Sequence, residues 1–265
     1  MSDNGDNGDI DNYIVEKALK RFEHNRDENR ILRKRSEDYD IREEVFDKPT
    51  LMTLNELMTS KLFKYLNGVV KAGKEARIYW GVRADGTDVA VKIYLTDNVE
   101  FRKRLPYIIG DPRFKRIRKG IRNLVQLWAK KEYSNLKKAI CNNIPCPKPF
   151  AVKNNVLVME FIGKEGISAP ILGDVDVTEK DYLELLSIIH DLYRNAHLVH
   201  SDLSEYNVFK HMDNLIIFDF GSAVDIMHPN AEDFLIRDIT NINHFFSKRQ
   251  IDTFSIEESL KMVKR

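Results

Sequence analysis

Residues 198–221, with the sequence LVHSDLSEYNVFKHMDNLIIFDFG, constrain the fold of this chain more than any other stretch. Two short apolar runs within it have the composition of β-strands, and polar side chains follow each of them. The first run leads to Asp202 and Asn207, and the second leads to Asp219. Strand-like runs that end at carboxylates place charge at the edge of a sheet, so the sequence predicts a polar cleft beside this edge.

The spacing of these polar residues is typical of a phosphoryl-transfer site. An Asp, an Asn five residues later and an Asp twelve residues beyond that match the pattern H-x-D-x-x-x-x-N followed by D-F-G. In that chemistry Asp202 orients the attacking hydroxyl or water, and oxygens of Asn207 and Asp219 hold Mg²⁺ against the phosphates. Each motif alone is common by chance, and the alternative is a pair of ordinary turn residues. Their combined order and spacing favour a phosphotransferase.

The length and composition fit a folded chain with one large domain or two lobes. The 265 residues are 43% hydrophobic, enough for a core, and no apolar run approaches the ~20 residues that span a membrane. The acidic, polar N-terminus predicts no signal peptide. Cys141 and Cys146 lack a second pair at metal-binding spacing, which predicts two free thiols in a reducing cytosol. We therefore expect a cytoplasmic protein with no membrane and no DNA partner.

Composition divides the chain into three parts. Residues 1–48 are densely charged, and we expect a partly disordered extension with a marginal helix. Residues 49–162 are predicted to form an N-terminal lobe, and residues 163–265 a C-terminal lobe.

The N-terminal lobe is expected to begin with a short helix after Pro49, capped by Thr53 or Asn55. Three strands are predicted to follow it, at residues 67–73, 77–82 and 88–95.

The turn between the first two strands contains a misleading motif. Residues 68–74 match the P-loop pattern G-x-x-x-x-G-K, but the next residue, Glu75, offers no hydroxyl to Mg²⁺. The residues after it look like a strand, whereas a P-loop opens a helix. We therefore reject the P-loop fold and expect a strand turn over the nucleotide, with backbone N–H groups and Lys74 facing the phosphates.

A pair of buried charges is expected in the same site. Lys92 ends the tetrapeptide VAVK, which is close to the V-A-I-K of kinases, and the small Ala90 on its face leaves room for a nucleotide base. Helical periodicity over residues 121–140 turns Glu132 inward. A buried charge needs a partner, and Lys92 is the candidate. The alternatives are that Lys92 is the polar side of an edge strand and that Glu132 is solvated.

Residues 96–120 form a long insert between these two elements, and we expect a functional or mobile loop. Basic residues dominate the segment 102–122, where Asp111 is the one acid. Such a run indicates either a solvated face or an anion-binding patch for phosphate or RNA, and the composition leaves both interpretations open.

The lobes are expected to meet at VMEFIG, residues 158–163, where backbone groups of Glu160 and Ile162 could pair with adenine. A plain strand end would have the same residues. Only 44 residues follow Gly221, and no Ala-Pro-Glu occurs among them. We therefore expect neither an activation loop nor a peptide-binding helical subdomain.

Several sequence motifs of the chain resemble those of the RIO family of atypical serine/threonine protein kinases. The runs are YLNGVV and GKEA within 65–76, VAVKIY at 89–94, GDPRF at 110–114, WAKKEYSNL at 128–136, HSDLSEYN at 200–207 and HPNAEDFLIRD at 228–238. The resemblance covers roughly residues 45–245 and is closer to the Rio-one-like branch than to the second branch. The second branch adds an N-terminal winged helix, for which too little apolar sequence precedes residue 50.

The resemblance implies an α+β, two-lobed protein-kinase-like fold that lacks an activation loop and a peptide-binding subdomain and carries an N-terminal helical extension. It implies ATP with Mg²⁺ or Mn²⁺, serine/threonine phosphorylation including autophosphorylation, and ATPase activity. It also implies a role in maturing the small ribosomal subunit, whose precursor RNA and proteins would be partners. The insert at 96–120 corresponds to the flexible loop of the family.

The resemblance also assigns roles to residues. Lys92 would contact the α- and β-phosphates, and the backbones of Glu160 and Ile162 would contact adenine. Asp202 would be the catalytic base, and Asn207 and Asp219 would bind the metal. Asp219 would also accept phosphate in an ATPase cycle.

Two departures from the family pattern affect nucleotide geometry rather than the metal ligands. Lys71-Ala72 stand where the family usually has Ser-Thr, and Gly221-Ser222 stand where it often has Gly-Gln. Two rival functions remain. One is a small-molecule kinase of the aminoglycoside-phosphotransferase kind, which usually has a larger C-terminal substrate region. The other is a non-catalytic assembly factor that uses ATP as a conformational switch.

Overall fold

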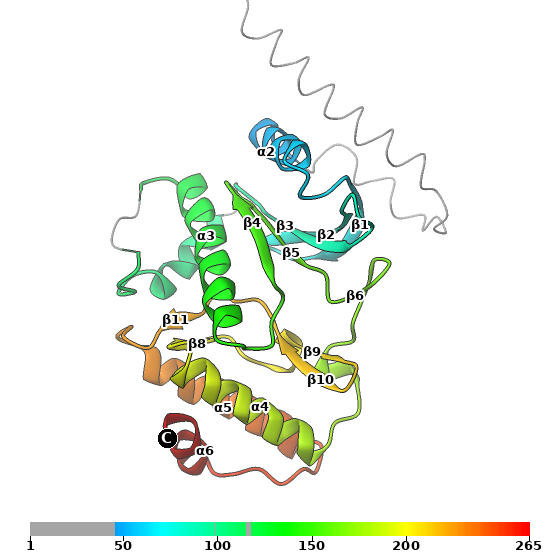
Figure 1. Cartoon of the computed structure of the whole chain (residues 1–265). Helices are drawn as coiled ribbons and strands as arrows, with labels where there is room; N and C mark the ends of the chain where they lie inside the picture. Colours follow the sequence, from blue (N-terminus) through cyan, green and yellow to red (C-terminus); the bar gives the residue numbers. More distant parts are fainter. Residues whose placement is uncertain (1–45, 98, 115–117) are drawn as a thin grey trace, which may run out of the picture.

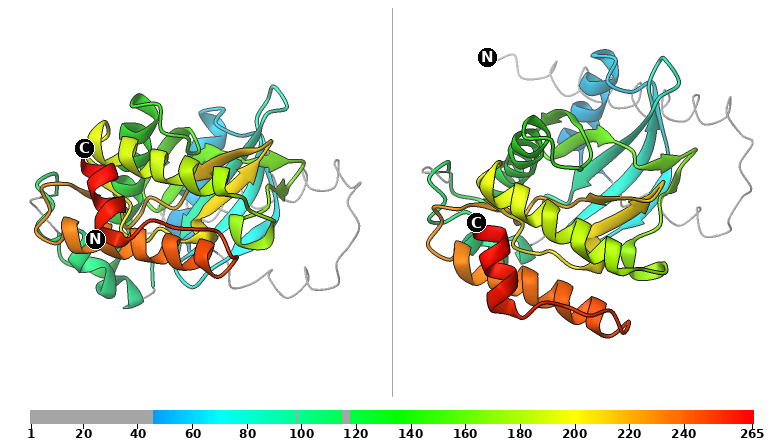
Figure 2. Two further views of the ribbon diagram at one scale, coloured as in Figure 1. Left: turned by 90° about the horizontal axis from the view of Figure 1, so that it is seen from below. Right: turned by 60° about the horizontal axis from the view of Figure 1, so that its bottom comes forward.

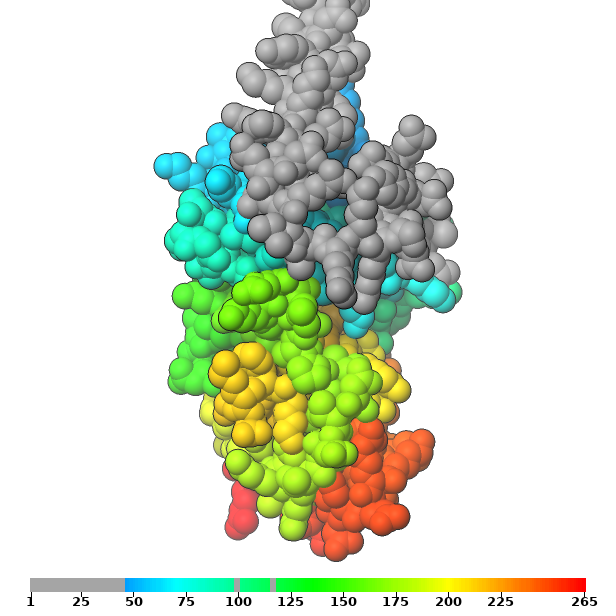
Figure 3. All heavy atoms as spheres, turned by 90° about the vertical axis from the view of Figure 1, so that its right-hand side faces the viewer, coloured from blue at the N-terminus to red at the C-terminus, as the bar shows by residue number. Residues whose placement is uncertain are grey.

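The computed structural model describes residues 46–97, 99–114 and 118–265, and these form two stacked lobes (Figure 1). The predictions for residues 1–45, most of the charged extension, lie outside the described residues. In a space-filling view, blue and cyan segments lie at one end and orange and red segments at the other, so the two halves of the sequence form the two lobes (Figure 3). No helix of the described ranges is long and apolar enough to cross a membrane.

The N-terminal lobe contains an antiparallel sheet of five strands in the order β1-β2-β3-β5-β4. The strands are β1 (Tyr65–Ala72), β2 (Ala76–Val82), β3 (Asp88–Tyr94), β4 (Pro149–Lys153) and β5 (Val156–Glu160). The three predicted strands are confirmed, whereas β4 was not predicted. Pro149 begins β4 at the edge of the sheet, where a missing N–H is tolerated.

Alternation along β3 divides its side chains between two apolar clusters. Val89 and Val91 pack in a cluster that includes the apolar residues of α2 (Lys48–Thr59). Ala90 and Tyr94 point to the other face and join the main core. This alternation was predicted from the sequence, and it places Lys92 on the side of the main core.

The start of α2 differs from the prediction. Asp47 is the N-cap, and its carboxylate accepts the N–H of Thr50 at 2.9 Å. Pro49 lies in the first turn, where its missing N–H would have no helical partner in any case. The prediction of Thr53 or Asn55 as the cap was therefore wrong, because the helix begins before the proline rather than after it.

α3 (Ile121–Cys141) crosses the core-facing side of the sheet beside β4 (Figure 1) and matches the predicted helix. The insert before α3 was expected to be a loop, but residues Val99–Tyr107 form a 3₁₀ helix, η2. Its Phe101 is fully buried, with its ring centroid 6.4 Å from that of Trp128, and Ile108 is also fully buried. The expectation of a loop is thus corrected for this part of the insert.

The C-terminal lobe is mainly helical, and its short strands are paired antiparallel (Figure 2). Its elements are β6 (Gly163–Lys164), β7 (Ile167–Ser168), η3 (Leu172–Asp174), α4 (Glu179–Arg194), β8 (Leu198–Val199), η4 (Glu205–Asn207), β9 (Val208–His211), β10 (Asn214–Ile217), β11 (Val224–Asp225), α5 (Ala231–Ser247) and α6 (Ile256–Lys264). A capping box of Thr178 and Asp181 begins α4, and α6 packs against both α4 and α5.

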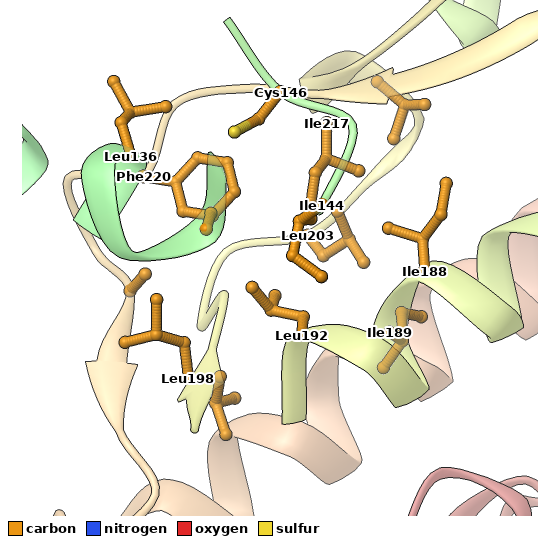
Figure 4. Packing of buried hydrophobic residues seen from close by; sticks show 14 of the residues in the cluster. Leu136, Ile144, Cys146, Ile188, Ile189, Leu192, Leu198, Leu203, Ile217 and Phe220 are labelled. Atoms are coloured by element: carbon orange, nitrogen blue, oxygen red, sulfur yellow. The ribbon is translucent and has the colours of Figure 1, made fainter. Parts of the chain in front are cut away.

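The main core continues from α3 into the C-terminal lobe beneath the strands that carry the site. Figure 4 shows Phe220 beside Leu136 of α3, with Cys146 and Ile217 nearby. After Asp219 the chain passes directly into β11 and then α5. Within the described residues, therefore, no activation loop follows the D-F-G sequence, as predicted.

Candidate active site

Lys92 stands at the centre of the candidate site. Its side chain is 9% exposed, and its Nζ donates to the two carboxylate oxygens of Glu132 at 2.8 and 2.9 Å. The same Nζ donates to Oδ1 of Asp219 at 2.8 Å. Strand β3, helix α3 and the segment after β10 thus converge on one ammonium group. The predicted pairing of Lys92 with Glu132 is confirmed, and Lys92 does not lie at an edge strand.

The electrostatics of this cluster favour a charged lysine. Burial alone would lower the pKa of Lys92, but the carboxylates of Asp219 and Glu132 outweigh it and raise this pKa above its ordinary value. Burial raises the pKa of Glu132 to about 7, although Lys92 opposes the shift. Tyr94 also donates its hydroxyl to Glu132. For Asp219, Lys92 overcomes the effect of burial and lowers the pKa.

The backbone around Asp202 is held from α5. Asp238 accepts the N–H of Ser201 at 2.7 Å and the N–H of Leu203 at 2.9 Å, one on each side of Asp202. Arg237 donates to the Ser201 carbonyl. Ser201 has φ = 66°, so this turn needs external support. Sequence reasoning did not single out Asp238 as a site residue; its one signal was its place in the matched run at 228–238.

Burial raises the pKa of Asp202 and of Asp238, the α5 residue that supports its loop. Burial raises the pKa of Asp202, and the charge of Asp219 adds to the effect, while Arg104 and Arg237 oppose it. Burial raises the pKa of Asp238 to about 7. The amide nitrogen of Asn207 donates to the Asp202 carbonyl at 2.8 Å.

Asp219 is presented by a strained turn that its neighbours hold. Its φ is 65°, and Phe220 behind it is fully buried in the core. His200 Nε2 lies 3.0 Å from the carbonyl oxygen of Phe218, and burial lowers the pKa of His200 to about 4. Because a carbonyl only accepts, the neutral ring carries its proton on Nε2. His200 thus fixes the backbone before Asp219.

A second buried cation of α3 holds the chain after Asp219. Lys131 is fully buried and donates to the carbonyl oxygens of Gly221, at 2.9 Å, and Ala223. Asn135, also fully buried, donates to the carbonyl oxygens of Phe220 and Ala223 at 2.8 Å each. Burial lowers the pKa of Lys131 to about 7. No pattern in the sequence assigned a role to Lys131, which entered only as the neighbour of Glu132 in the alternative that Glu132 is solvated.

Gly221 is required by the close approach of α3. A Cβ atom at this position would lie 2.7 Å from the indole nitrogen of Trp128, and no side chain fits there.

These groups surround a cleft of about 310 Å³ between the lobes. Of the predicted site residues, Lys74, Lys92, Glu132, Asp202 and Asp219 line it. Other lining residues include Lys71, Glu75, Ala76, Ile78, Tyr94, Arg104, Trp128, Met159, Phe218 and Ser222. The described structure therefore brings the predicted phosphate-binding and catalytic residues together in one cavity.

The predicted adenine residues Glu160 and Ile162 and the predicted metal ligand Asn207 are not among the residues that line this cleft. The Ile162 carbonyl accepts the N–H of Ala169 at 2.8 Å. The exposed carboxylate of Glu160 accepts the N–H of Lys148 at 3.1 Å. Asn207 is tied to Asp202 through its nitrogen, which leaves the amide oxygen as its potential ligand atom.

The donor set fits a hard divalent cation. Asp219 offers a carboxylate whose side chain is 47% exposed, and Asn207 offers an amide oxygen. Such oxygen ligands suit Mg²⁺, which binds through one or two carboxylates and phosphate oxygens. Among the described residues, no group of three His, Cys, Asp or Glu side chains forms a metal cage, and both cysteines are free thiols.

Several basic residues of the segment 102–122 are paired within the chain. Arg113 binds Asp111 through Nε at 2.8 Å and Nη2 at 2.6 Å, and it also donates to Asn135 at 2.6 Å. Arg122 binds Asp47 at 2.5 Å. The other part of the predicted basic patch at residues 115–117 lies outside the described residues.

Comparisons with known proteins agree with this geometry. The sequence model of the RIO domain family matches residues 77–259. The chain is 34% identical over 255 residues to "Serine/threonine-protein kinase rio1" of Dictyostelium discoideum, covering 94% of this chain and 44% of that protein. It is 36% identical over 227 residues to "Serine/threonine-protein kinase RIO1" of Homo sapiens, covering 83% of this chain and 40% of the human protein.

An archaeal relative is matched over most of its own length. The "RIO-type serine/threonine-protein kinase Rio1" of Haloferax volcanii is 35% identical over 247 residues, covering 92% of this chain and 84% of that protein. Among solved structures, the Rio2 kinase–ADP/Mg²⁺–phosphoaspartate complex from Chaetomium thermophilum superimposes with a TM-score of 0.63 at 24% identity, covering 82% of this chain and 66% of that chain. This likeness shows a shared fold, which is the two-lobed fold predicted from the sequence.

Proposed function

The chain belongs to the RIO domain family, with Rio1 proteins among its relatives, and on that premise we propose that it is an ATP-dependent serine/threonine kinase with ATPase activity. The observation that carries the proposal is the convergence of Glu132 and Asp219 on Lys92, in a cleft that Asp202 also lines. Phosphoryl transfer requires groups that position the phosphoryl group and stabilise its charge. A buried lysine held between two carboxylates, with a potential base beside it, meets this requirement.

In the proposed reaction, a serine or threonine hydroxyl, or a water molecule, lies beside Asp202. Its oxygen bonds to the γ-phosphorus, the bond from phosphorus to the β–γ bridging oxygen breaks, and ADP leaves with that electron pair. The proton of the attacking group passes to the Asp202 carboxylate. Because the pKa of Asp202 is raised, its carboxylate is a better proton acceptor than an exposed one.

The remaining residues would bind and orient the nucleotide. Lys92 would contact the α- and β-phosphates, Lys74 would face the phosphates from the β1–β2 turn, and the backbones of Glu160 and Ile162 would bind adenine. Asn207 and Asp219 would hold Mg²⁺, or Mn²⁺ with its similar oxygen preference, and the metal would neutralise phosphate charge. The Rio2 complex contains ADP, Mg²⁺ and a phosphoaspartate, which supports Asp219 as a candidate phosphate acceptor.

We further propose that the protein acts in the cytoplasm on the precursor of the small ribosomal subunit. Family membership is the support for this role. Exposed basic residues of the insert, such as Arg118 and Lys119, could contribute to RNA binding. Replacing both with alanine should weaken RNA binding and flatten its salt dependence; unchanged binding would assign them to a solvated face.

One experiment separates the enzyme from its rivals. The wild type and Asp202→Asn are incubated with γ-labelled ATP, with and without small-subunit precursors, and free phosphate and labelled protein are measured. If the protein is a kinase, the wild type should label serine or threonine residues and Asp202→Asn should not. If it is an ATPase switch, the precursors should stimulate the release of free phosphate. Equal turnover by both proteins would refute the catalytic assignment, and transfer only to an added aminoglycoside would favour the small-molecule kinase.

A further inference from the structure

Four basic side chains line the cleft in the described part of the chain, and one of them is not a lysine. Lys71, Lys74 and Lys92 belong to the strands of the N-terminal lobe and their turn. Arg104 is the exception, because it comes from the 3₁₀ helix η2 inside the insert. The roles proposed above leave Arg104 without a function.

Arg104 lies between the two groups of residues that would surround the phosphates. Its Nε and Nη2 each lie 2.8 Å from Oε1 of Glu75, in the turn between β1 and β2. Its Nη1 lies 3.5 Å from the hydroxyl oxygen of Ser222, three residues after Asp219. The guanidinium therefore spans the cleft from the turn of the N-terminal lobe to the segment that presents the potential metal ligand.

The position of the guanidinium is fixed by its supports. Phe101 and Ile108 anchor the two ends of η2 in the core, and both are fully buried. The guanidinium carbon lies 5.8 Å from the ring centroid of Trp128 in α3, within the range of a cation–π contact. The Arg104 side chain remains 28% exposed, so it is held in place yet open to the cleft.

The charge of Arg104 acts on the proposed reaction centre. The charge of Arg104 opposes the rise that burial causes in the pKa of Asp202. It also contributes to the lowered pKa of Asp219. Bonding to Glu75 keeps the pKa of Arg104 above its ordinary value although burial opposes this, so the group is cationic at every physiological pH.

We propose that Arg104 binds the γ-phosphoryl group of ATP and is a catalytic residue of the phosphoryl transfer assigned above, on which this inference rests. A guanidinium offers a planar fork of N–H donors that matches phosphate oxygens. Glu75 occupies Nε and Nη2 at a single oxygen, so Nη1 is the donor that faces the Ser222 side of the cleft. In the transition state, negative charge is spread over the equatorial oxygens of the γ-phosphoryl group, and a preorganised cation there lowers the barrier.

Lys71 is less suited to this role. Its Nζ lies 5.8 Å from the ring centroid of Phe218, so its charge rests over an aromatic surface of the cleft. Phe218 stacks on Phe209 with a centroid separation of 4.0 Å, so this part of the cleft has an apolar floor. An apolar floor fits a nucleotide base rather than a phosphate.

The test compares nucleotides that differ in the γ-phosphate. Affinities of the full chain for Mg²⁺–ADP and for Mg²⁺ with the non-hydrolysable analogue AMP-PNP are measured by calorimetry for the wild type, Arg104→Ala and Arg104→Lys. The control is Arg102→Ala, since Arg102 is an exposed arginine of the same 3₁₀ helix. Melting temperatures confirm that each variant is folded. If Arg104→Ala does not fold, Arg104→Lys serves as the test variant, because it keeps the positive charge and removes the guanidinium.

We expect Arg104→Ala to lose about tenfold or more in affinity for AMP-PNP and less than twofold for ADP, with kcat lowered by about 100-fold. Arg104→Lys should lie between Arg104→Ala and the wild type, and Arg102→Ala should match the wild type. Equal losses for ADP and AMP-PNP, or no loss for either, would overturn the inference while leaving the proposed function intact. A wild type that binds neither nucleotide would overturn the proposed function itself.

Discussion

The ammonium nitrogen of Lys92 lies 2.8 Å from Oδ1 of Asp219, so the two lobes are joined by an ion pair inside the proposed phosphate site. Lys92 occupies an oxygen that a metal ion would use, and the side chain of Asp219 is 47% exposed whereas that of Glu132 is 1% exposed. Lys92 can therefore exchange Asp219 for phosphate oxygens when nucleotide enters, while its bonds to Glu132 remain in the dry interior. We propose that the ion pair couples metal binding to nucleotide binding in this way.

Replacing Lys92 with methionine should abolish measurable ATP affinity and lower stability. The loss of stability arises at Glu132, since removing one partner of a buried ion pair costs about 3–5 kcal/mol. The double variant Lys92→Met/Glu132→Gln should recover much of this stability but none of the affinity, as chemical denaturation and calorimetry would show. Lys164→Met, at a side chain 86% exposed, is the control. Tight ATP binding by Lys92→Met would rule out the assigned role.

Replacing Asn135 with leucine should loosen the turn that presents Asp219. The carbonyl oxygens of Phe220 and Ala223 each lose one donor, at a cost of about 0.5–1.5 kcal/mol for each lost hydrogen bond. Neither oxygen is left unpaired, because Lys131 still donates to Ala223 and the N–H of Ala223 still donates to Phe220. The Mg²⁺ concentration for half-maximal rate should rise, whereas nucleotide affinity without Mg²⁺ should stay the same. A Mg²⁺ titration of the rate measures this, with the exposed Asn214→Leu as control. An unchanged Mg²⁺ requirement would reduce Asn135 to a purely structural residue.

The stability of the protein should depend on pH through Asp238. Its pKa is raised to about 7 in the fold and is about 3.9 in an unfolded chain, so the folded state binds the proton more tightly. This group stabilises the fold fully below about pH 4, and the stabilisation is lost as pH rises to about 7. The free energy of unfolding of the wild type relative to Asp238→Asn should therefore fall across this interval in urea titrations. A pH-independent difference would show that Asp238 is ionised throughout.

The pH–rate profile should report the ionisation of Asp202. The rate should fall as pH drops through the raised pKa of this residue, because the protonated acid cannot accept a proton. Arg104→Ala should move this acidic limb to higher pH, since Arg104 lowers the pKa of Asp202. Single-turnover rates measured between about pH 4 and 8 provide the test. A limb that stays in place would show that Arg104 lies too far from the reaction centre.

The sequence predicted the parts of the site that follow from local periodicity and motif spacing. Alternation along residues 88–94 placed Lys92 toward the core, and a 3.6-residue period placed Glu132 on the inner face of α3. From these two positions an ion pair between Lys92 and Glu132 could be predicted, since each side chain would otherwise be an unpaired buried charge. That reasoning needs only the chain's own pattern, and the ion pair confirms it.

The support around the site could not be predicted in the same way. Helical periodicity assumes one buried stripe, but α3 is buried by the sheet, by η2 and by the segment after Asp219, so Lys131 and Asn135 are also enclosed. Their partners are backbone carbonyls about ninety residues away in the chain, which no local pattern reveals. The position of Arg104 in the site could not be predicted for another reason. It is one of many basic residues in the segment 102–122, and its insert was expected to be a loop.

The most direct test is a crystal structure of the protein with Mg²⁺ and AMP-PNP. The account predicts nucleotide density in the cleft of about 310 Å³, with the phosphates against Lys92 and Arg104 and the metal between Asn207 and Asp219. Nucleotide bound elsewhere, or a metal that contacts neither Asn207 nor Asp219, would contradict it.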